Sequence, residues 1–283
     1  MFGDAPLNSP QDLHLVAEID KRVFADRAEY MGDPEVVDGP VKPLIDPAYL
    51  DRRAADIDPR KPLAPAAVKP RVEEPQTTHF SIVDRWGNAV SNSYTLNVWF
   101  GAGVVVKGTG FRLNDEIDNS SVKPGAPNQF GVVEGDASAI APGKCPLSSM
   151  TPTICMKDGQ GAVVLRTPGG SRFFTALFPV LANVYAHGPP LNQAVAAQRF
   201  HDQFLPGNTI FFEPYAPPSE AMKPALTARG YRLETQDYNG DIEAIQIRDD
   251  APIAVAGPRA GGVARIVRRS PTERFVRPAR RLR

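Results

Sequence analysis

The sequence lacks the features that mark several protein classes. Its 283 residues include only two cysteines, Cys145 and Cys155, which cannot form a disulfide framework. No apolar run approaches the roughly 20 residues needed to cross a bilayer, so we expect no membrane span. The first ten residues have no basic segment followed by an apolar one, and we expect no signal peptide in this chain. The remaining composition, 42% hydrophobic and 23% charged, is ordinary for a globular protein.

An excess of charge of either sign is also absent, although the charge is unevenly spread. The last nineteen residues, 265–283, carry eight arginines and one glutamate, which leaves 24 basic and 31 acidic residues in the body. An acidic body argues against a nucleic-acid-binding surface, so we expect no nucleic-acid partner. We interpret the basic tail, 266–283, as a solvated and disordered extension, with a site for an anionic partner as the alternative.

Histidine is scarce, and the four present (His14, His79, His187 and His201) do not have metal-ligand spacing. The sequence also lacks a G-x-S-x-G elbow and a phosphate-binding loop. We therefore expect no metal and no cofactor. His201 could act as a catalytic base, but we interpret it as a structural histidine. A hydrolase built from this sequence must find its nucleophile and its base elsewhere.

The pattern of residue types changes along the chain. Helical spacing of apolar residues over 10–31 predicts a helix that enters through Ser9-Pro10. Residues 32–76 hold nine prolines in 45 positions and are expected to form an extended, exposed connector. Residues 78–84 and 89–97 are β-branched and aromatic runs around a glycine-containing turn, which is typical of a hairpin.

The later part mixes strand-like and helix-like segments. Further strands are expected at 104–106, 153–156, 162–166, 209–212, 231–234, 242–248 and 253–256, with helices at 171–186, 191–197 and 219–229 and a loop over 119–149. Strands first, helices in the middle and strands last predict a layered α+β fold.

One nucleophile that needs no separate base is a threonine at the start of a chain, because its own α-amino group can accept the proton. Thr77 follows the proline-rich connector and opens a strand, although such a threonine is also an ordinary strand residue. If the hairpin loop has three residues, Asp84 pairs with Asn88 and Thr77 lies opposite Thr95. Asn97 then points to the same face. A one-residue slip would turn Thr95 away.

These residues resemble a known family. The runs Thr77-Thr78-His79-Phe80-Ser81-Ile82-Val83-Asp84, Gly87-Asn88-Ala89-Val90 and Tyr94-Thr95-Leu96-Asn97 resemble the start of the small subunit of gamma-glutamyltransferases. In family order follow Phe100-Gly101-Ala102-Gly103, Lys123-Pro124-Gly125, Pro146-Leu147-Ser148-Ser149-Met150-Thr151-Pro152-Thr153, Pro168-Gly169-Gly170-Ser171-Arg172 and Arg199-Phe200-His201. Ala25-Asp26-Arg27 and Gly32-Asp33-Pro34 resemble the end of the large subunit, so the resemblance covers roughly residues 5–265.

The resemblance implies an N-terminal-nucleophile hydrolase with an αββα sandwich. Residues 1–76 would be the end of the large subunit, 77–265 the small catalytic subunit and 266–283 the basic tail. Most of the large subunit would then be absent, including part of the sandwich. Either another chain supplies that part, or the chain is a catalytically silent fragment or subunit. Family members are usually periplasmic or secreted, and the compartment of this chain stays open.

The resemblance also implies the chemistry. The precursor would cut itself between Gln76 and Thr77, and Thr77 would then attack a γ-glutamyl amide such as glutathione, with water or an amino acid as acceptor. Thr95 would hold the nucleophile, and Gly169 with Gly170 would form the oxyanion hole. The glutamyl α-amino group would meet Asn97 and Glu116, and the α-carboxylate would meet Ser148 and Ser149. Singly, these glycines and serines are also typical of ordinary turns.

Two positions depart from the family pattern. Asn119 stands where the family has an acidic partner for the α-ammonium, and neutral hydrogen bonds are about half as strong as charge-assisted ones. Asp118 is adjacent but points away if the segment is extended. Glu116 would then bind the ammonium alone, or the acyl group would lack an amine, as in related acylases for glutaryl-like amides. Glu243 stands where an amide is expected, and the sequence does not explain it.

Overall fold

The computed structural model describes residues 5–64, 76–204, 207–237, 239–248 and 251–267. Part of the expected connector (65–75) and most of the basic tail (268–283) lie outside the described residues. The first helix, α1 (Pro10–Tyr30), begins where expected and ends one residue before the expected limit. Ser9 caps it by accepting a hydrogen bond from the Asp12 backbone nitrogen, and Pro10 lies in its first turn.

The expectation of an extended connector after α1 is wrong in part. Two short helices, α2 (Val41–Leu44) and α3 (Pro47–Ala55), interrupt it. Asp46 caps α3 by accepting from the backbone nitrogens of Ala48 and Tyr49, and Pro47 lies in its first turn. Arg53 of α3 forms an ion pair with Asp26 of α1. A proline in the first turn of a helix does not disrupt the helix. A count of prolines does not show which of them occupy that position.

The predicted hairpin is present with the predicted register. Strands β1 (Gln76–Val83) and β2 (Ala89–Asn97) pair antiparallel, and Thr77 lies opposite Thr95. The Asp84 nitrogen donates to the Asn88 carbonyl at 2.9 Å, which closes the three-residue loop. A register shift follows at the open end, so that Gln76 lies opposite Asn97. The nucleophile candidate therefore sits beside a bulge, where the ladder ends.

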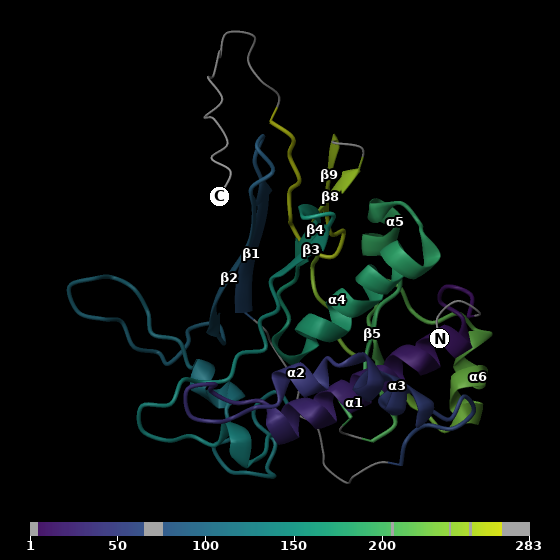
Figure 1. The fold of residues 1–283 in the computed structure, drawn as a ribbon, viewed down its shortest axis with the longest axis horizontal. Coiled ribbons are helices and arrows are strands. Elements are labelled where there is room, and N and C mark those ends of the chain that lie inside the picture. The colour runs from purple at the N-terminus through teal and green to yellow at the C-terminus, as the bar shows by residue number, and fades with distance from the viewer. Residues whose placement is uncertain (1–4, 65–75, 205–206, 238, 249–250, 268–283) are drawn as a thin grey trace.

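A second sheet lies beneath the hairpin. Its strands are β3 (Thr153–Lys157), β4 (Gln160–Arg166), β8 (Glu243–Arg248) and β9 (Ala251–Ala256), in the order β3-β4-β8-β9. Buried Val163, Leu165 and Ala244 pack in one core cluster with residues of helices α4 (Phe173–Ala182) and α5 (Leu191–Ala196). The hairpin contacts β4 and β8, and Ser91 donates to the Leu165 carbonyl at 3.4 Å. Helices, sheet and hairpin thus form successive layers (Figure 1).

The inner and outer faces of the hairpin have opposite character. Outward-facing Phe80, Ile82, Val90 and Tyr94 are 43–62% exposed, whereas the alternate residues, which are less exposed, are almost all polar: Thr77, His79, Ser81, Ser91, Ser93 and Thr95. In a protein of two packed layers, the apolar face of a sheet is expected to lie against the other layer. The described residues therefore form three of the four layers expected for an αββα sandwich, and the α+β class is confirmed.

The third sheet packs the N-terminal helix α1 against the C-terminal part of the chain. Strands β5 (Phe200–His201), β6 (Thr209–Phe212) and β7 (Arg232–Thr235) pack with helix α6 (Met222–Arg229) and α1 in a second core, which includes Leu13, Phe212 and Leu226. Strand β5 has only two residues and was not predicted. The expected strand at 104–106 is wrong: that exposed loop holds only an isolated bridge between Val105 and Arg112.

The remaining predicted segments are confirmed in outline. The expected helix at 171–186 is divided into a 3-10 turn (Gly170–Arg172), α4 and a π-helical turn (Asn183–His187). The expected loop at 119–149 contains a short 3-10 turn, Asp136–Ser138, and another 3-10 turn, Glu116–Asn119, leads into it. No helix in the described part of the chain is long and apolar enough to cross a membrane.

Candidate active site

Thr77 and Thr95 lie side by side at the open end of the hairpin. Their hydroxyl oxygens are 3.0 Å apart, within hydrogen-bonding distance. The Thr95 hydroxyl also accepts from the Asn97 backbone nitrogen at 2.8 Å. With that acceptance in place, the Thr95 proton can point to Thr77, so Thr95 can orient the hydroxyl of its cross-strand neighbour. Among the residue pairs expected in the site, Thr77 and Thr95 are the pair whose side chains contact each other directly.

A line of hydrogen bonds continues from Thr95 toward α1. The Asn119 amide donates to the Asn97 side-chain oxygen at 3.0 Å, and the Ser149 hydroxyl donates to the Asn119 oxygen at 3.4 Å. Arg27 of α1 donates to the same Ser149 hydroxyl at 3.0 Å. Asn97, Asn119, Ser149 and Arg27 are all buried or nearly so. The structure thus brings the predicted residues of two distant loops together with one residue of the first helix.

Asn97 adopts a left-handed backbone, with φ of 75°. Asparagine is among the few residues that tolerate this conformation. The turn ends β2, and the Asn97 amide nitrogen donates to the Asp115 carbonyl at 3.3 Å. This contact fixes the start of the Glu116–Asn119 turn, which carries two of the expected substrate-binding residues.

Glu116 is a buried carboxylate with one free oxygen. Ser148 donates to Oε1 at 3.0 Å, and Oε2 is buried without a hydrogen-bond partner among the described residues. Desolvation by burial raises the pKa of Glu116, and the bond from Ser148 opposes that rise. A cationic group of a ligand at Oε2 would compensate the cost of this burial. Ser148 binds Glu116 here, whereas the expectation had placed it with the substrate carboxylate.

Asn119 lies between Asn97 and Ser149, and the segment around it differs from the condition stated for Asp118. The segment is a 3-10 turn and not extended. Asp118 nevertheless faces elsewhere, because its carboxylate accepts from the Gln129 backbone nitrogen at 3.3 Å. Near Asn97 the structure therefore places one carboxylate, Glu116, and one neutral amide, Asn119.

The glycine pair forms the turn between β4 and α4. Gly169 has φ of 156° and Gly170 has φ of 54°, values that favour glycine. The turn leads into α4, so its backbone N–H groups lie at a helix N-terminus, where negative charge is stabilised. Arg166, three residues earlier, donates to the Thr78 carbonyl at 3.4 Å, which ties this end of β4 to the strand that begins beside Thr77.

The sequence reasoning did not identify two of the residues in this region. Arg27 was quoted only as part of a motif, yet it reaches Ser149 and forms an ion pair with Glu134. Arg166 was not singled out at all, although its side chain is fully buried against the hairpin. A signal was present for Arg166, because an arginine that ends an otherwise apolar strand in a core requires a polar reason.

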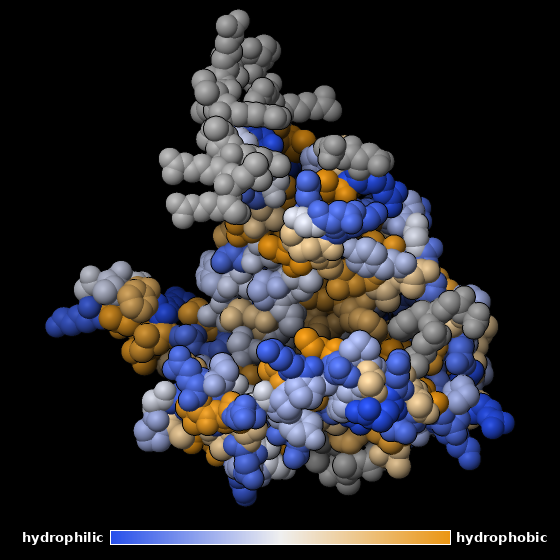
Figure 2. All heavy atoms as spheres, viewed as in Figure 1, coloured by the Kyte–Doolittle hydropathy of each residue, from blue (hydrophilic) through white to orange (hydrophobic). Residues whose placement is uncertain are grey.

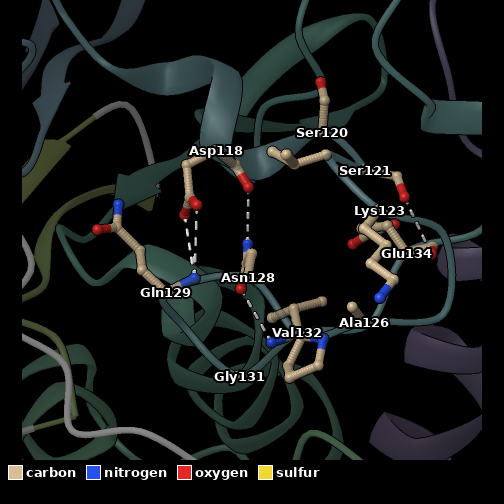
Figure 3. A pocket seen from close by; sticks show the side chains of 12 residues that line it. Asp118, Ser120, Ser121, Lys123, Ala126, Asn128, Gln129, Gly131, Val132 and Glu134 are labelled. Carbon is tan, nitrogen blue, oxygen red and sulfur yellow. Dashed lines mark hydrogen bonds between the residues drawn. The ribbon is translucent and has the colours of Figure 1, made fainter.

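A cavity of about 430 Å³ adjoins the site (Figure 3). None of the predicted site residues lines it. Its wall includes Asp118 and Ser120, which flank Asn119, and Glu134, the partner of Arg27. The segment 126–132 closes one side through bonds from Asn128 and Gln129 to Asp118.

His201 is structural, as interpreted from the sequence. It is 2% exposed, and its ring nitrogens lie 2.8 Å from the Thr175 hydroxyl and 2.9 Å from the Gln203 oxygen. Desolvation lowers its pKa to about 3, so it is neutral near pH 7 and bonded at both nitrogens. No group of three potential metal ligands occurs within the described ranges.

Comparison with known proteins gives a consistent result. The sequence model of the family described as Gamma-glutamyltranspeptidase matches residues 1–267. A glutathione hydrolase proenzyme of Pseudomonas aeruginosa is 54% identical over 268 residues, which cover 94% of this chain and 48% of that protein. An acylase ACY 1 proenzyme of Pseudomonas sp. (strain SE83) is 34% identical over 278 residues, covering 93% of this chain and 47% of that protein.

A solved structure is similar as well. The gamma-glutamyltranspeptidase of Pseudomonas nitroreducens complexed with L-DON has a TM-score of 0.65 and 56% sequence identity. The match covers 68% of this chain and 100% of that chain. By contrast, this chain spans only about half the length of the curated proenzymes that it matches.

Proposed function

Because this chain belongs to the gamma-glutamyltranspeptidase family, we propose that it is the catalytic part of a self-processing enzyme that hydrolyses or transfers γ-glutamyl amides such as glutathione. The observation that carries the proposal is the 3.0 Å contact between the Thr77 and Thr95 hydroxyls at the start of β1. A threonine in this place can become both nucleophile and base once the chain is cut before it.

Self-processing requires only groups that the hairpin already positions. The Thr77 hydroxyl attacks the Gln76 carbonyl carbon, the peptide nitrogen leaves as the Thr77 amine, and an ester joins Gln76 to Thr77. Water then hydrolyses the ester, which leaves a Gln76 carboxylate and a free Thr77 amine. The bulge between Gln76 and Thr77 supports this step, because it places the scissile bond at a break in the ladder.

The mature site would then act by covalent catalysis. The Thr77 oxygen attacks the amide carbonyl of the substrate, and its proton passes to the Thr77 amine. Backbone N–H groups of Gly169 and Gly170 would stabilise the oxyanion, a contribution of about 3 kcal/mol per donor in characterised enzymes. The leaving amine takes the proton, and water or an acceptor amine releases the acyl group from the Thr77 ester.

The acyl pocket supports two substrate classes. Glu116, with its buried free oxygen, and the Asn97 amide suit an α-ammonium, and Ser149 with Arg27 suits a carboxylate. The second candidate is a glutaryl-like acyl group that has no amine. Asn119 favours it, because the site then holds one carboxylate instead of two. The similarity to an acylase proenzyme is consistent with either class.

We also propose that the apolar outer face of the hairpin is covered by a segment equivalent to the part of the relatives that this chain does not match. The exposed side chains of Phe80, Ile82, Val90 and Tyr94 support this, since an uncovered apolar sheet face is unstable in water. The comparisons agree with a boundary inside this chain in matched length alone. The solved relative is matched over its whole length by 68% of this chain, whereas the proenzymes match more than 90% of it.

Intact-mass analysis of the purified protein tests the processing step. We expect two pieces, the second of which begins at Thr77, and a single uncut chain after Thr77→Ala. Thr77→Ser should still be cut, because serine keeps the hydroxyl. A wild-type chain that stays uncut, both alone and with the complementary half of the enzyme supplied, would reject the proposal.

Paired chromogenic anilides test the acyl group. Wild-type protein is assayed with γ-glutamyl anilide and with glutaryl anilide, alongside Asn119→Asp. For a γ-glutamyl enzyme we expect the first substrate to be preferred, and the aspartate variant to increase that preference by about tenfold, since a charged hydrogen bond is roughly 1 kcal/mol or more stronger than a neutral one. Preference of the wild type for glutaryl anilide would establish the second class.

A further inference from the structure

Arg166 is a buried cation whose charge the catalytic roles above do not use. It ends β4, is 0% exposed, and points to the hairpin, whereas Val163 and Leu165 face the helices. Its Nη1 donates to the Thr78 carbonyl at 3.4 Å, and its guanidinium carbon lies 4.4 Å from the centroid of the Phe173 ring. One side chain therefore touches both the residue after the nucleophile and the residue that begins α4 behind the glycine turn.

The guanidinium retains unused hydrogen-bonding capacity. Its Nε and Nη2 atoms are buried without a hydrogen-bond partner among the described residues. A buried charge without full pairing is costly, and such arrangements are concentrated at functional sites. Desolvation lowers the pKa of Arg166 to about 9, so the group remains cationic near pH 7.

The groups around Arg166 compensate its charge only in part at neutral pH. Glu243 is its cross-strand partner on β8, but desolvation and nearby Asp241 raise the pKa of Glu243 to about 8. Glu116, on the Glu116–Asn119 turn, is a carboxylate that stabilises the Arg166 cation, although burial raises its pKa. His79 on β1 is kept neutral, since desolvation and then Arg166 lower its pKa to about 4. Position 243 thereby acquires an explanation: a carboxyl group there faces the arginine.

We propose that Arg166 is a positioning residue that keeps the Thr77 amine, once released, in its neutral and proton-accepting form, and that it holds the nucleophile strand against the oxyanion turn. This inference rests on the proposed self-processing function. An ordinary terminal amine has a pKa near 7.7–8.0 and is mostly protonated at pH 7, when it cannot accept a proton. Arg166 contacts Thr78, the residue next to Thr77 along the strand. A cation at that position would lower the pKa of the Thr77 amine by roughly one unit.

The direct test measures the ionisation of the Thr77 amine. Cleaved protein is labelled with trace isotopic acetic anhydride from pH 5 to pH 9, and labelling of the peptide that begins at Thr77 is quantified by mass spectrometry. We expect a wild-type pKa near 7 and a rise of about one unit in Arg166→Met, which keeps the length and the contact with Phe173. Arg166→Lys, which keeps the charge, should stay within a few tenths of the wild type.

Arg248→Met is the matched control. It removes one positive charge from the same sheet, at an exposed site five residues along β8 from Glu243. At about 3.3 Å per residue, that charge lies beyond the screening length of physiological salt, so the amine should not change. The acid limb of kcat/KM against pH should follow the labelling data in each variant.

Two outcomes would overturn the inference: an unchanged amine pKa in Arg166→Met, or a shift of equal size in Arg248→Met. If Arg166→Met fails to fold, Arg166→Gln replaces it, because its amide can still donate to the Thr78 carbonyl. If the wild type does not cut itself, the self-processing proposal fails separately. The same labelling is then done on 1–76 co-expressed with 77–283, whose initiator methionine is removed before threonine.

Discussion

Thr95 is the residue whose role can be separated most cleanly from folding. Its hydroxyl accepts from the Asn97 nitrogen and lies 3.0 Å from the Thr77 hydroxyl. Thr95→Val removes the hydroxyl at nearly constant volume, so Thr77, the proposed nucleophile, loses its orienting partner. We expect kcat to fall by about 10- to 100-fold, in the range attributed to positioning effects, while KM changes little.

The measurement is steady-state kinetics on a γ-glutamyl anilide, with thermal unfolding in parallel. Thr95→Ser keeps the hydroxyl and is expected to retain most of the activity. A valine variant with wild-type kcat would show that the contact has no role in positioning. Because one backbone bond to the lost hydroxyl is also broken, a loss of stability of about 1 kcal/mol is expected in the valine variant.

His201 predicts the sign of one contribution to acid stability. In the folded protein desolvation lowers its pKa from 6.5 to about 3, so the unfolded chain binds a proton at pH values between these limits and the folded protein does not. The stability that this histidine contributes is therefore complete above pH 6.5 and is lost as the pH falls toward 3. The slope is at most about 1.4 kcal/mol per pH unit.

His201→Gln removes this proton linkage. Urea unfolding of both proteins at pH 7 and pH 4.5 gives the comparison. We expect the wild type to lose about 2–3 kcal/mol more than the variant over this interval, whatever constant offset the substitution introduces. Equal losses would mean that His201 titrates normally in the folded state.

The sequence predicted the register of the hairpin correctly, but not the electrostatics around it. The alternation of the hairpin and its turn sufficed to place Thr77 opposite Thr95, because register follows from loop length. The resemblance named Glu116, Asn119, Ser148 and Ser149 as candidates, but not which of them bond to each other. Arg166 was missed because its significance depends on β1 lying against the end of β4, a packing between segments far apart in the chain.

At the scale of elements, the two-residue strand β5 and the three residues after it connect the Gly169–Gly170 turn to the cavity wall. Gln203 accepts from the Ser171 hydroxyl at 2.8 Å and donates to the Phe130 carbonyl at 3.0 Å. Ser171 follows the glycine pair, and Phe130 lies in the segment that closes the cavity beside Asn119. One buried amide therefore joins two segments more than 40 residues apart.

Two substitutions at Gln203 separate these contacts. Gln203→Glu keeps the acceptor for Ser171 and loses the donor to Phe130, whereas Gln203→Leu loses both. In hydrogen exchange, we expect faster exchange over 126–133 in both variants and over 170–175 only in the leucine variant, because an amide that loses its support opens locally at lower free energy. Unchanged exchange over 126–133 in both variants would contradict the connection.

The same scale shows why some elements escaped prediction. Helix α3 was hidden by a proline-rich composition, although Asp46-Pro47 is a sound helix start. Strand β5 has two residues, too few for any periodicity, and exists because β6 pairs with it. The supposed strand at 104–106 has the right residue types but no neighbouring strand to pair with. Composition describes a segment by itself. The structures of α3, β5 and residues 104–106 depend instead on the segments that lie beside them.

For the whole molecule, the inverted character of the hairpin is the dominant feature. In Figure 2 apolar residues reach the surface at several places, among them the loop that protrudes beside the hairpin, where Phe100, Val105 and Phe111 are 55–63% exposed. Exposed apolar surface of this extent marks an interface in soluble proteins. We therefore expect the chain alone to self-associate, and to associate with a chain equivalent to the unmatched part of its relatives when that chain is supplied.

The double variant Ile82→Lys with Val90→Glu tests this expectation. These two residues are cross-strand partners on the outer face, 52% and 47% exposed, so an opposite-charge pair preserves the pairing of the hairpin while making its face polar. Light scattering should show the wild type to be larger than a monomer and the variant to be monomeric. The variant should also fail to bind the complementary half.

Met156→Lys is the matched control, since Met156 on β3 is 60% exposed and lies in the other sheet. Its association should equal that of the wild type. Equal association of the double variant and the wild type would mean that the apolar face of the hairpin is not what drives it. The polar inner face would then need another explanation, because a two-stranded hairpin that buries polar side chains and exposes apolar ones is stable only when a further layer covers its outer side.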